Sequence, residues 1–114
     1  MIKAHADTFR RAMAAHLKIA FGTDAGAFPW TTNPAKEFSA LVRDGMTPAV
    51  ALQSATVQAA RLMQMDDNVG VIEAGKLADI VAVPGNPLDQ ISEMEKVDFV
   101  MKNGVVYRNT QTVK

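Results

Sequence analysis

The apolar pattern of this chain changes its period once, near Asp66. Before that point apolar residues recur at helical spacing. The clearest series is Leu52, Ala55, Ala59 and Met63. After it, short apolar runs alternate with turn-forming residues, which is typical of strands. The change predicts an α/β portion over residues 1–66 and an antiparallel β portion over residues 67–114.

Four elements are expected in the first portion. They are a helix over 4–15, a short strand over Leu17–Phe21, a helix from Asn33-Pro34 to Gly45, and a longer helix from Thr47-Pro48 to about Met65. Asn and Thr can accept an N-cap hydrogen bond, and proline is pre-set for the first helical turn. Glycine is the preferred residue just after a helix.

The second portion contains short strand candidates over 69–72, 77–83, 97–102 and 105–108. The last two flank Asn103-Gly104, and this dipeptide between apolar runs is the strongest short signal for a β-hairpin. Asp79 lies within an apolar run, where a charge is costly unless it is paired, so we expect a structural role for it.

Composition excludes several classes of function. Lys and Arg total 12, as do Asp and Glu, and no basic cluster occurs, so nucleic acid is not expected as a partner. The chain has no cysteine, which excludes disulfides and thiolate sites. No apolar run approaches the roughly 20 residues of a membrane span, and the N-terminus does not resemble a signal peptide. We expect no membrane partner and a cytoplasmic location.

Asp24 is the strongest candidate for chemistry. It lies three residues after the end of the apolar run, between Gly22 and Gly26. A carboxylate at the end of a strand can bind a metal ion or accept a proton from metal-bound water. Alternatively, it can bond to the backbone of its own turn, which is common for Asp. The local pattern leaves both interpretations open.

Several blocks together resemble one family. They are Lys18–Gly26, Glu37-Phe38, Gly45–Pro48, Ala51–Thr56, Gly70–Val83 and Val100–Tyr107. In order and spacing they resemble the amidohydrolase superfamily from its eighth barrel strand onward, and in particular its imidazolonepropionase-like and Xaa-Pro dipeptidase (prolidase) branch. The resemblance covers about residues 16–109.

This resemblance implies the terminal portion of a (β/α)8 TIM-type barrel, an α/β fold, followed by C-terminal strands of a small β-sandwich. It also implies that Asp24 is a metal ligand, with zinc as the expected divalent ion, and that it helps to activate the hydrolytic water. The family's other ligands, a His-x-His pair, a Lys or Glu, and two single His residues, follow strands that this chain lacks. We therefore expect no stoichiometric metal on this chain alone.

The evidence for a functional role is weaker for the other candidate residues. His5 and His16 match no short ligand motif, and we expect structural or surface roles for both. Trp30 follows Asp24 in a loop, where it could line a substrate pocket or cover the barrel rim. Relatives often carry a His-Gly pair near this position, so Trp30 weakens any substrate assignment.

The resemblance thus implies a C-terminal fragment of a metal-dependent amidohydrolase. The complete enzyme would hydrolyse C–N bonds of a small amide, cyclic amide or Xaa-Pro dipeptide, and the fragment alone would be inactive. The unpaired edges of strand Leu17–Phe21 predict a partner, either the missing N-terminal barrel portion or a second copy in a homo-oligomer. The alternative is a non-catalytic structural or interaction module. A sugar- or nucleotide-binding domain lacks support, because no Gly-rich phosphate loop is present.

Overall fold

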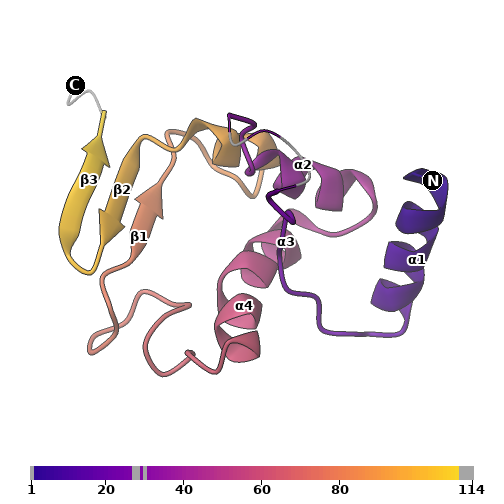
Figure 1. Cartoon of the computed structure of the whole chain (residues 1–114), viewed down its shortest axis with the longest axis horizontal. Helices are drawn as coiled ribbons and strands as arrows, with labels where there is room; N and C mark the ends of the chain where they lie inside the picture. The colour runs from indigo at the N-terminus through magenta and orange to yellow at the C-terminus, as the bar shows by residue number, and fades with distance from the viewer. Residues whose placement is uncertain (1, 27–28, 30, 111–114) are drawn as a thin grey trace.

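The computed structural model describes residues 2–26, 29 and 31–110. The elements, in order, are α1 (Ile2–Ala14), α2 (Lys36–Arg43), α3 (Pro48–Ala55), α4 (Val57–Leu62), β1 (Ile80–Ala82), the 3-10 helix η1 (Ile91–Lys96), β2 (Phe99–Lys102) and β3 (Val105–Asn109). The three strands lie at one end of the molecule and α1 lies at the other, as Figure 1 shows. No helix within the described ranges has the length and apolar character needed to cross a bilayer.

Three helices end in the same way, with a residue in the left-handed conformation followed by a hydrogen bond back across the last turn. These residues are His16 (φ 54°), Gly45 (φ 116°) and Gln64 (φ 55°). The bonds run from Leu17 N–H to the Ala12 carbonyl, from Met46 N–H to the Leu41 carbonyl and from Met65 N–H to the Ala60 carbonyl. This is the Schellman arrangement, which satisfies carbonyls that have no partner within the helix. It confirms the predicted helix stop at Gly45.

The predicted helix starts are confirmed in part. Thr47 caps α3, since its Oγ1 accepts a hydrogen bond from Val50 N–H at 3.3 Å and Pro48 opens the helix. The helix after Asn33 begins later than expected. Asn33 Oδ1 accepts a bond from Ala35 N–H at 3.0 Å, which forms a turn, and α2 itself begins at Lys36.

The single long helix predicted from Thr47 to Met65 is wrong. The chain breaks at Thr56, which has φ −119° and ψ −90°, and α3 and α4 are separate helices. The Thr56 hydroxyl donates a hydrogen bond to the Leu52 carbonyl at 2.9 Å. A threonine hydroxyl that bonds back to this carbonyl competes with the helical ladder and often bends a helix.

The core lies between α2 and α3. Its buried apolar residues are Phe38, Leu41, Met46 and Ala51. Phe9 and Met13 of α1 pack against it from one side, and Ile91 and Met94 of η1 pack against it from another. Because η1 follows the predicted boundary at residue 66, part of the second portion packs onto the core of the first.

The C-terminal strands form one antiparallel sheet in the order β1-β2-β3. Lys102 pairs with Val105 across the predicted hairpin turn. Asn103 (φ 49°) and Gly104 (φ 77°) both have positive φ, as a type I′ turn requires. The hairpin prediction is confirmed, and of the run 77–83 only Ile80–Ala82 is a strand.

Two predicted strands, Leu17–Phe21 and 69–72, are absent from the described part of the chain. A strand needs a neighbour to pair with, and neither run has one there. Phe21 N–H instead donates a hydrogen bond to the Ser54 carbonyl at 3.0 Å. Gly70 approaches α4 so closely that a Cβ added to it would lie 2.8 Å from the Ala60 Cβ. Packing against helices replaces strand pairing in both runs.

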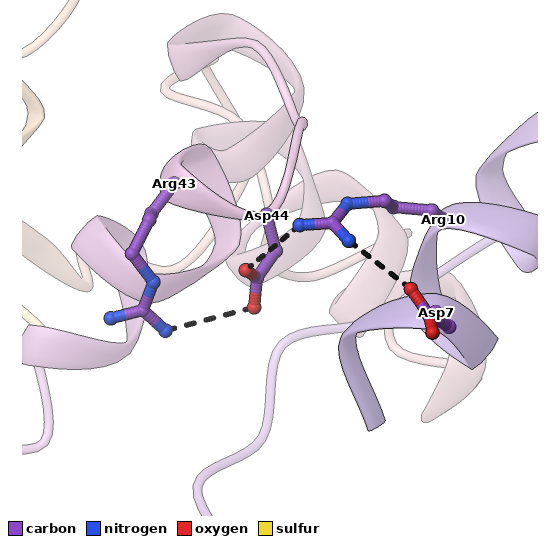
Figure 2. A network of polar contacts seen from close by, with 4 residues as sticks. All are labelled: Asp7, Arg10, Arg43 and Asp44. Carbon is purple, nitrogen blue, oxygen red and sulfur yellow. Dashed lines mark hydrogen bonds and ion pairs between the residues drawn. The ribbon is translucent and has the colours of Figure 1, made fainter. Parts of the chain in front are cut away.

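Polar contacts tie α1 to the end of α2 (Figure 2). Arg10 lies between two carboxylates, with one nitrogen 3.3 Å from Asp7 and another 3.7 Å from Asp44. Arg43 approaches the second oxygen of Asp44 at 3.6 Å. Such exposed pairs contribute about 0–1 kcal/mol each, so the apolar contacts of α1 carry most of its attachment.

Candidate functional site

The chain leading to Asp24 is fixed at Phe21. The Phe21 ring packs on Phe38 of α2, with ring centroids 4.5 Å apart and planes inclined by 30°. Its backbone N–H is bonded to Ser54, at the C-terminal end of α3. Ser54 is itself buried and bonded through its hydroxyl to the Ala51 carbonyl at 2.7 Å. The segment is therefore held to both helices three residues before Asp24.

Asp24 itself is exposed and has a left-handed backbone, with φ 50°. Asp and Asn adopt this conformation more readily than most residues. Within the described ranges, no hydrogen bond or ion pair involves its carboxylate. The carboxylate is thus presented on an open surface, available as an acceptor or ligand.

The loop after Asp24 is fixed again at Asn33. The Asn33 side-chain amide donates a hydrogen bond to the Glu95 carbonyl of η1 at 3.0 Å, and Ser39 donates one to the Glu95 carboxylate at 3.0 Å. Trp30, the predicted substrate-binding residue, lies outside the described residues. Sequence reasoning missed Glu95, because it lies 62 positions after Asn33 and no local pattern indicates their contact.

The two histidines lie away from Asp24 in the sequence and on a different element. His5 lines a cavity of about 460 Å³ between α1 and α2, together with Glu37 and Asp44. His16 is the left-handed residue that ends α1. In the part of the chain that the structure describes, no three His, Asp or Glu side chains converge as a metal site requires. The described residues therefore do not fit a complete metal site, and Asp24 offers a single carboxylate.

Asp79 has the partner that the sequence predicted it would need. Its carboxylate accepts hydrogen bonds from the Lys102 ammonium and from Asn103 N–H, both at 2.7 Å. The bond from Lys102, followed by that from the Asn103 backbone, holds the pKa of Asp79 below its usual value. Asp79 fixes the hairpin turn to the start of β1, which is a structural role.

Comparison with known proteins identifies the family. Residues 1–107 match the model of the Amidohydrolase family. The chain belongs to this family. It is 36% identical over 103 residues to an imidazolonepropionase of Geobacillus sp. (strain WCH70), which covers 85% of this chain and 24% of that protein. It is 30% identical over 109 residues to an ochratoxinase of Aspergillus niger, covering 92% of this chain and 22% of that protein.

Solved structures agree with this assignment. A Xaa-Pro dipeptidase with methionine bound in its active site superposes with a TM-score of 0.86 and 48% sequence identity, covering 91% of this chain and 25% of that one. The A. niger ochratoxinase superposes with a TM-score of 0.79 and 29% identity, covering 94% of this chain and 25% of that one. The chain thus spans about a quarter of the length of these relatives.

Proposed function

We propose that this chain is the C-terminal part of a metal-dependent amidohydrolase that hydrolyses C–N bonds. The 48% identity to a Xaa-Pro dipeptidase and the 36% identity to an imidazolonepropionase support this class. A dipeptide with C-terminal proline, another small amide or a cyclic amide is the proposed substrate class. Because the chain spans about a quarter of these relatives, the activity belongs to the complete enzyme.

Asp24 is the residue that we propose as catalytic. The observation that carries this role is its exposed carboxylate, three residues beyond the fixed point at Phe21. We propose that the Asp24 carboxylate is one ligand of a divalent metal ion, expected to be zinc. The other ligands of this ion would lie outside residues 1–114. A carboxylate placed there can also accept a proton from the hydrolytic water and deliver it to the departing amine.

The proposed fold of the complete enzyme gives each portion a place. Residues 1–66 would form the last part of a (β/α)8 barrel, in which the run Leu17–Phe21 becomes a strand once neighbouring strands are present. Residues 67–114 would join a composite β-sandwich through β1, β2 and β3. Trp30 would line the substrate pocket or cover the barrel rim. The proposed partner is the rest of the barrel or a second copy of the chain, and the proposed location is the cytoplasm.

A complementation assay tests the proposal. The chain is refolded with the N-terminal three quarters of a related Xaa-Pro dipeptidase and assayed for hydrolysis of a Xaa-Pro dipeptide. We expect activity with the unaltered chain and its loss with Asp24→Asn. Asp67→Asn, which removes another exposed carboxylate, is the matched control and should retain activity. Equal activity of the Asp24→Asn and control mixtures would refute the role of Asp24.

The second candidate is a non-catalytic structural or interaction module derived from the same family. The observation in its favour is that, among the described residues, no three His, Asp or Glu side chains converge as a metal site requires. The complementation assay separates the two candidates, because only the first predicts hydrolysis. Stoichiometric tight zinc on the purified chain alone would contradict the first candidate, since it assigns the remaining ligands to protein outside residues 1–114.

A further inference from the structure

The hairpin turn Asn103-Gly104 is an exposed site with reactive chemistry. Both residues are exposed, and a Cβ added to Gly104 would meet no heavy atom within 4 Å. Water therefore reaches the turn freely. In an Asn-Gly pair the backbone nitrogen of the glycine can attack the side-chain amide carbon of the asparagine. Glycine has no side chain to hinder this approach.

The other four asparagines of the chain are less reactive by this route. Asn33 and Asn86 precede proline, whose nitrogen has no hydrogen to lose and cannot act as the nucleophile. Asn68 and Asn109 precede the β-branched residues Val69 and Thr110, which hinder approach to the backbone nitrogen. Asn103 is the asparagine with an unhindered nucleophile.

We propose that Asn103 is the principal spontaneous deamidation site of this protein, and that the contacts of Asp79 and Ala78 with the turn slow the reaction. The Gly104 nitrogen loses its proton and attacks Asn103 Cγ. The Cγ–Nδ2 bond breaks, ammonia leaves, and a five-membered succinimide forms. Water then opens the ring at either carbonyl, which gives aspartate or isoaspartate. The balance is one water consumed and one ammonia released.

Three hydrogen bonds are expected to slow deamidation at Asn103 in the folded chain. Gly104 N–H, the nucleophile, donates to the Ala78 carbonyl at 3.1 Å. Asn103 N–H donates to one oxygen of Asp79 at 2.7 Å, and Lys102 Nζ donates to the other at 2.7 Å. To react, the Gly104 nitrogen must leave its acceptor and the turn must change its backbone angles. These bonds oppose both movements.

The products would disturb the same turn. Aspartate at position 103 adds a negative charge next to Asp79, whose carboxylate already occupies the space beside the turn. Isoaspartate adds a carbon to the backbone of a two-residue loop, and loop length sets the register of a hairpin. The pairing of Lys102 with Val105 would then be lost. Deamidation at Asn103 thus loosens β3 from β2.

Peptide mass spectrometry tests the proposal. The protein is incubated at mildly alkaline pH, digested at intervals, and each Asn peptide is followed for the exchange of NH2 for OH. One arm compares the folded protein with the same chain in concentrated urea. A second arm compares Asp79→Ala with Glu73→Ala, a matched control that removes an exposed carboxylate of the region before β1.

We expect Asn103 to deamidate before the other four asparagines, several-fold more slowly in the folded chain than in urea. Asp79→Ala should raise the folded rate several-fold, and Glu73→Ala should leave it unchanged. An earlier reaction at another asparagine would overturn the site. Equal rates in the folded and urea arms would overturn the protection, and this comparison does not depend on the folding of Asp79→Ala.

Discussion

Phe21 packs on Phe38 with ring centroids 4.5 Å apart, and this contact sets the point from which Asp24 projects. The two rings join a segment without regular structure to the buried face of α2. Phe38 is 7% exposed and belongs to the core, so Phe21 connects the candidate functional carboxylate to the best-packed part of the molecule. The Phe21 side chain therefore packs against the core and also fixes the segment that leads to Asp24.

Removing the Phe21 ring should destabilise the whole chain. Phe→Ala changes in cores cost about 3–5 kcal/mol, and Phe21 is half-buried, so we expect Phe21→Ala to lower the free energy of unfolding by about 2 kcal/mol. Urea denaturation measures this. Leu17→Ala, four positions earlier at a residue that is 63% exposed, should change stability by less than about 0.5 kcal/mol. Equal effects of the two substitutions would show that the ring contact does not hold this segment.

Replacing Asp24 should affect activity and leave stability nearly unchanged. Its carboxylate is exposed and has no partner within the described ranges, so Asp24→Asn should change stability by less than about 0.5 kcal/mol. In the complemented enzyme the same change should lower kcat by about 100-fold or more, because general acid–base groups contribute about 10²–10⁴-fold. Urea denaturation and a steady-state assay measure the two effects. A large loss of stability would point to a structural role instead.

Local signals in the sequence predicted much of this fold. Thr47-Pro48 indicated the start of α3, Gly45 the end of α2, and Asn103-Gly104 the hairpin, because each depends on a few adjacent residues. Asp24 was identified as a candidate in the same way. Its role rests on the family resemblance, because the position of a carboxylate at the end of an apolar run does not specify a ligand.

The sequence-based predictions failed where the structure depends on contacts between distant residues, or on a side chain that competes with the backbone for a hydrogen bond. The break at Thr56 depends on whether its hydroxyl bonds to Leu52, which helical periodicity does not reveal. Residues 17–21 have the composition of a strand, but strand formation requires a partner that the described chain does not provide. The contact of Asn33 with Glu95 joins the loop before α2 to η1, which is far away in the sequence, and no short pattern predicts it.

The left-handed residues that end α1 and α2 predict opposite effects of substitution. His16 adopts φ 54°, where a Cβ is unfavourable, so His16→Gly should stabilise the chain by about 0.5–1 kcal/mol. Gly45 adopts φ 116°, so Gly45→Ala should destabilise it by about 1 kcal/mol or more. Thermal unfolding measures both. Gly75→Ala, in a left-handed turn outside the helices (φ 91°), shows how much of the loss at Gly45 comes from the backbone angle alone.

The pairing of Asp79 with Lys102 and Asn103 predicts how the hairpin responds to acid. The pKa of Asp79 is lowered from 3.8 in the folded chain, mainly by the hydrogen bond from Lys102. A carboxylate with a lowered pKa binds protons more weakly when folded, so its contribution to stability is complete above the unfolded pKa. That contribution is lost as the pH falls from about 3.8 through the folded pKa.

The measurement is NMR of the β2–β3 amides over an acid titration, with Asp79→Asn as the variant. We expect the amides of Asn103 and Gly104 to keep their native shifts at neutral pH and to move as Asp79 titrates below pH 3.8. In Asp79→Asn this titration should be absent and the turn should be less protected at neutral pH, because an amide oxygen accepts more weakly than a carboxylate. Persistence of the same transition in the variant would show that Asp79 is not its cause.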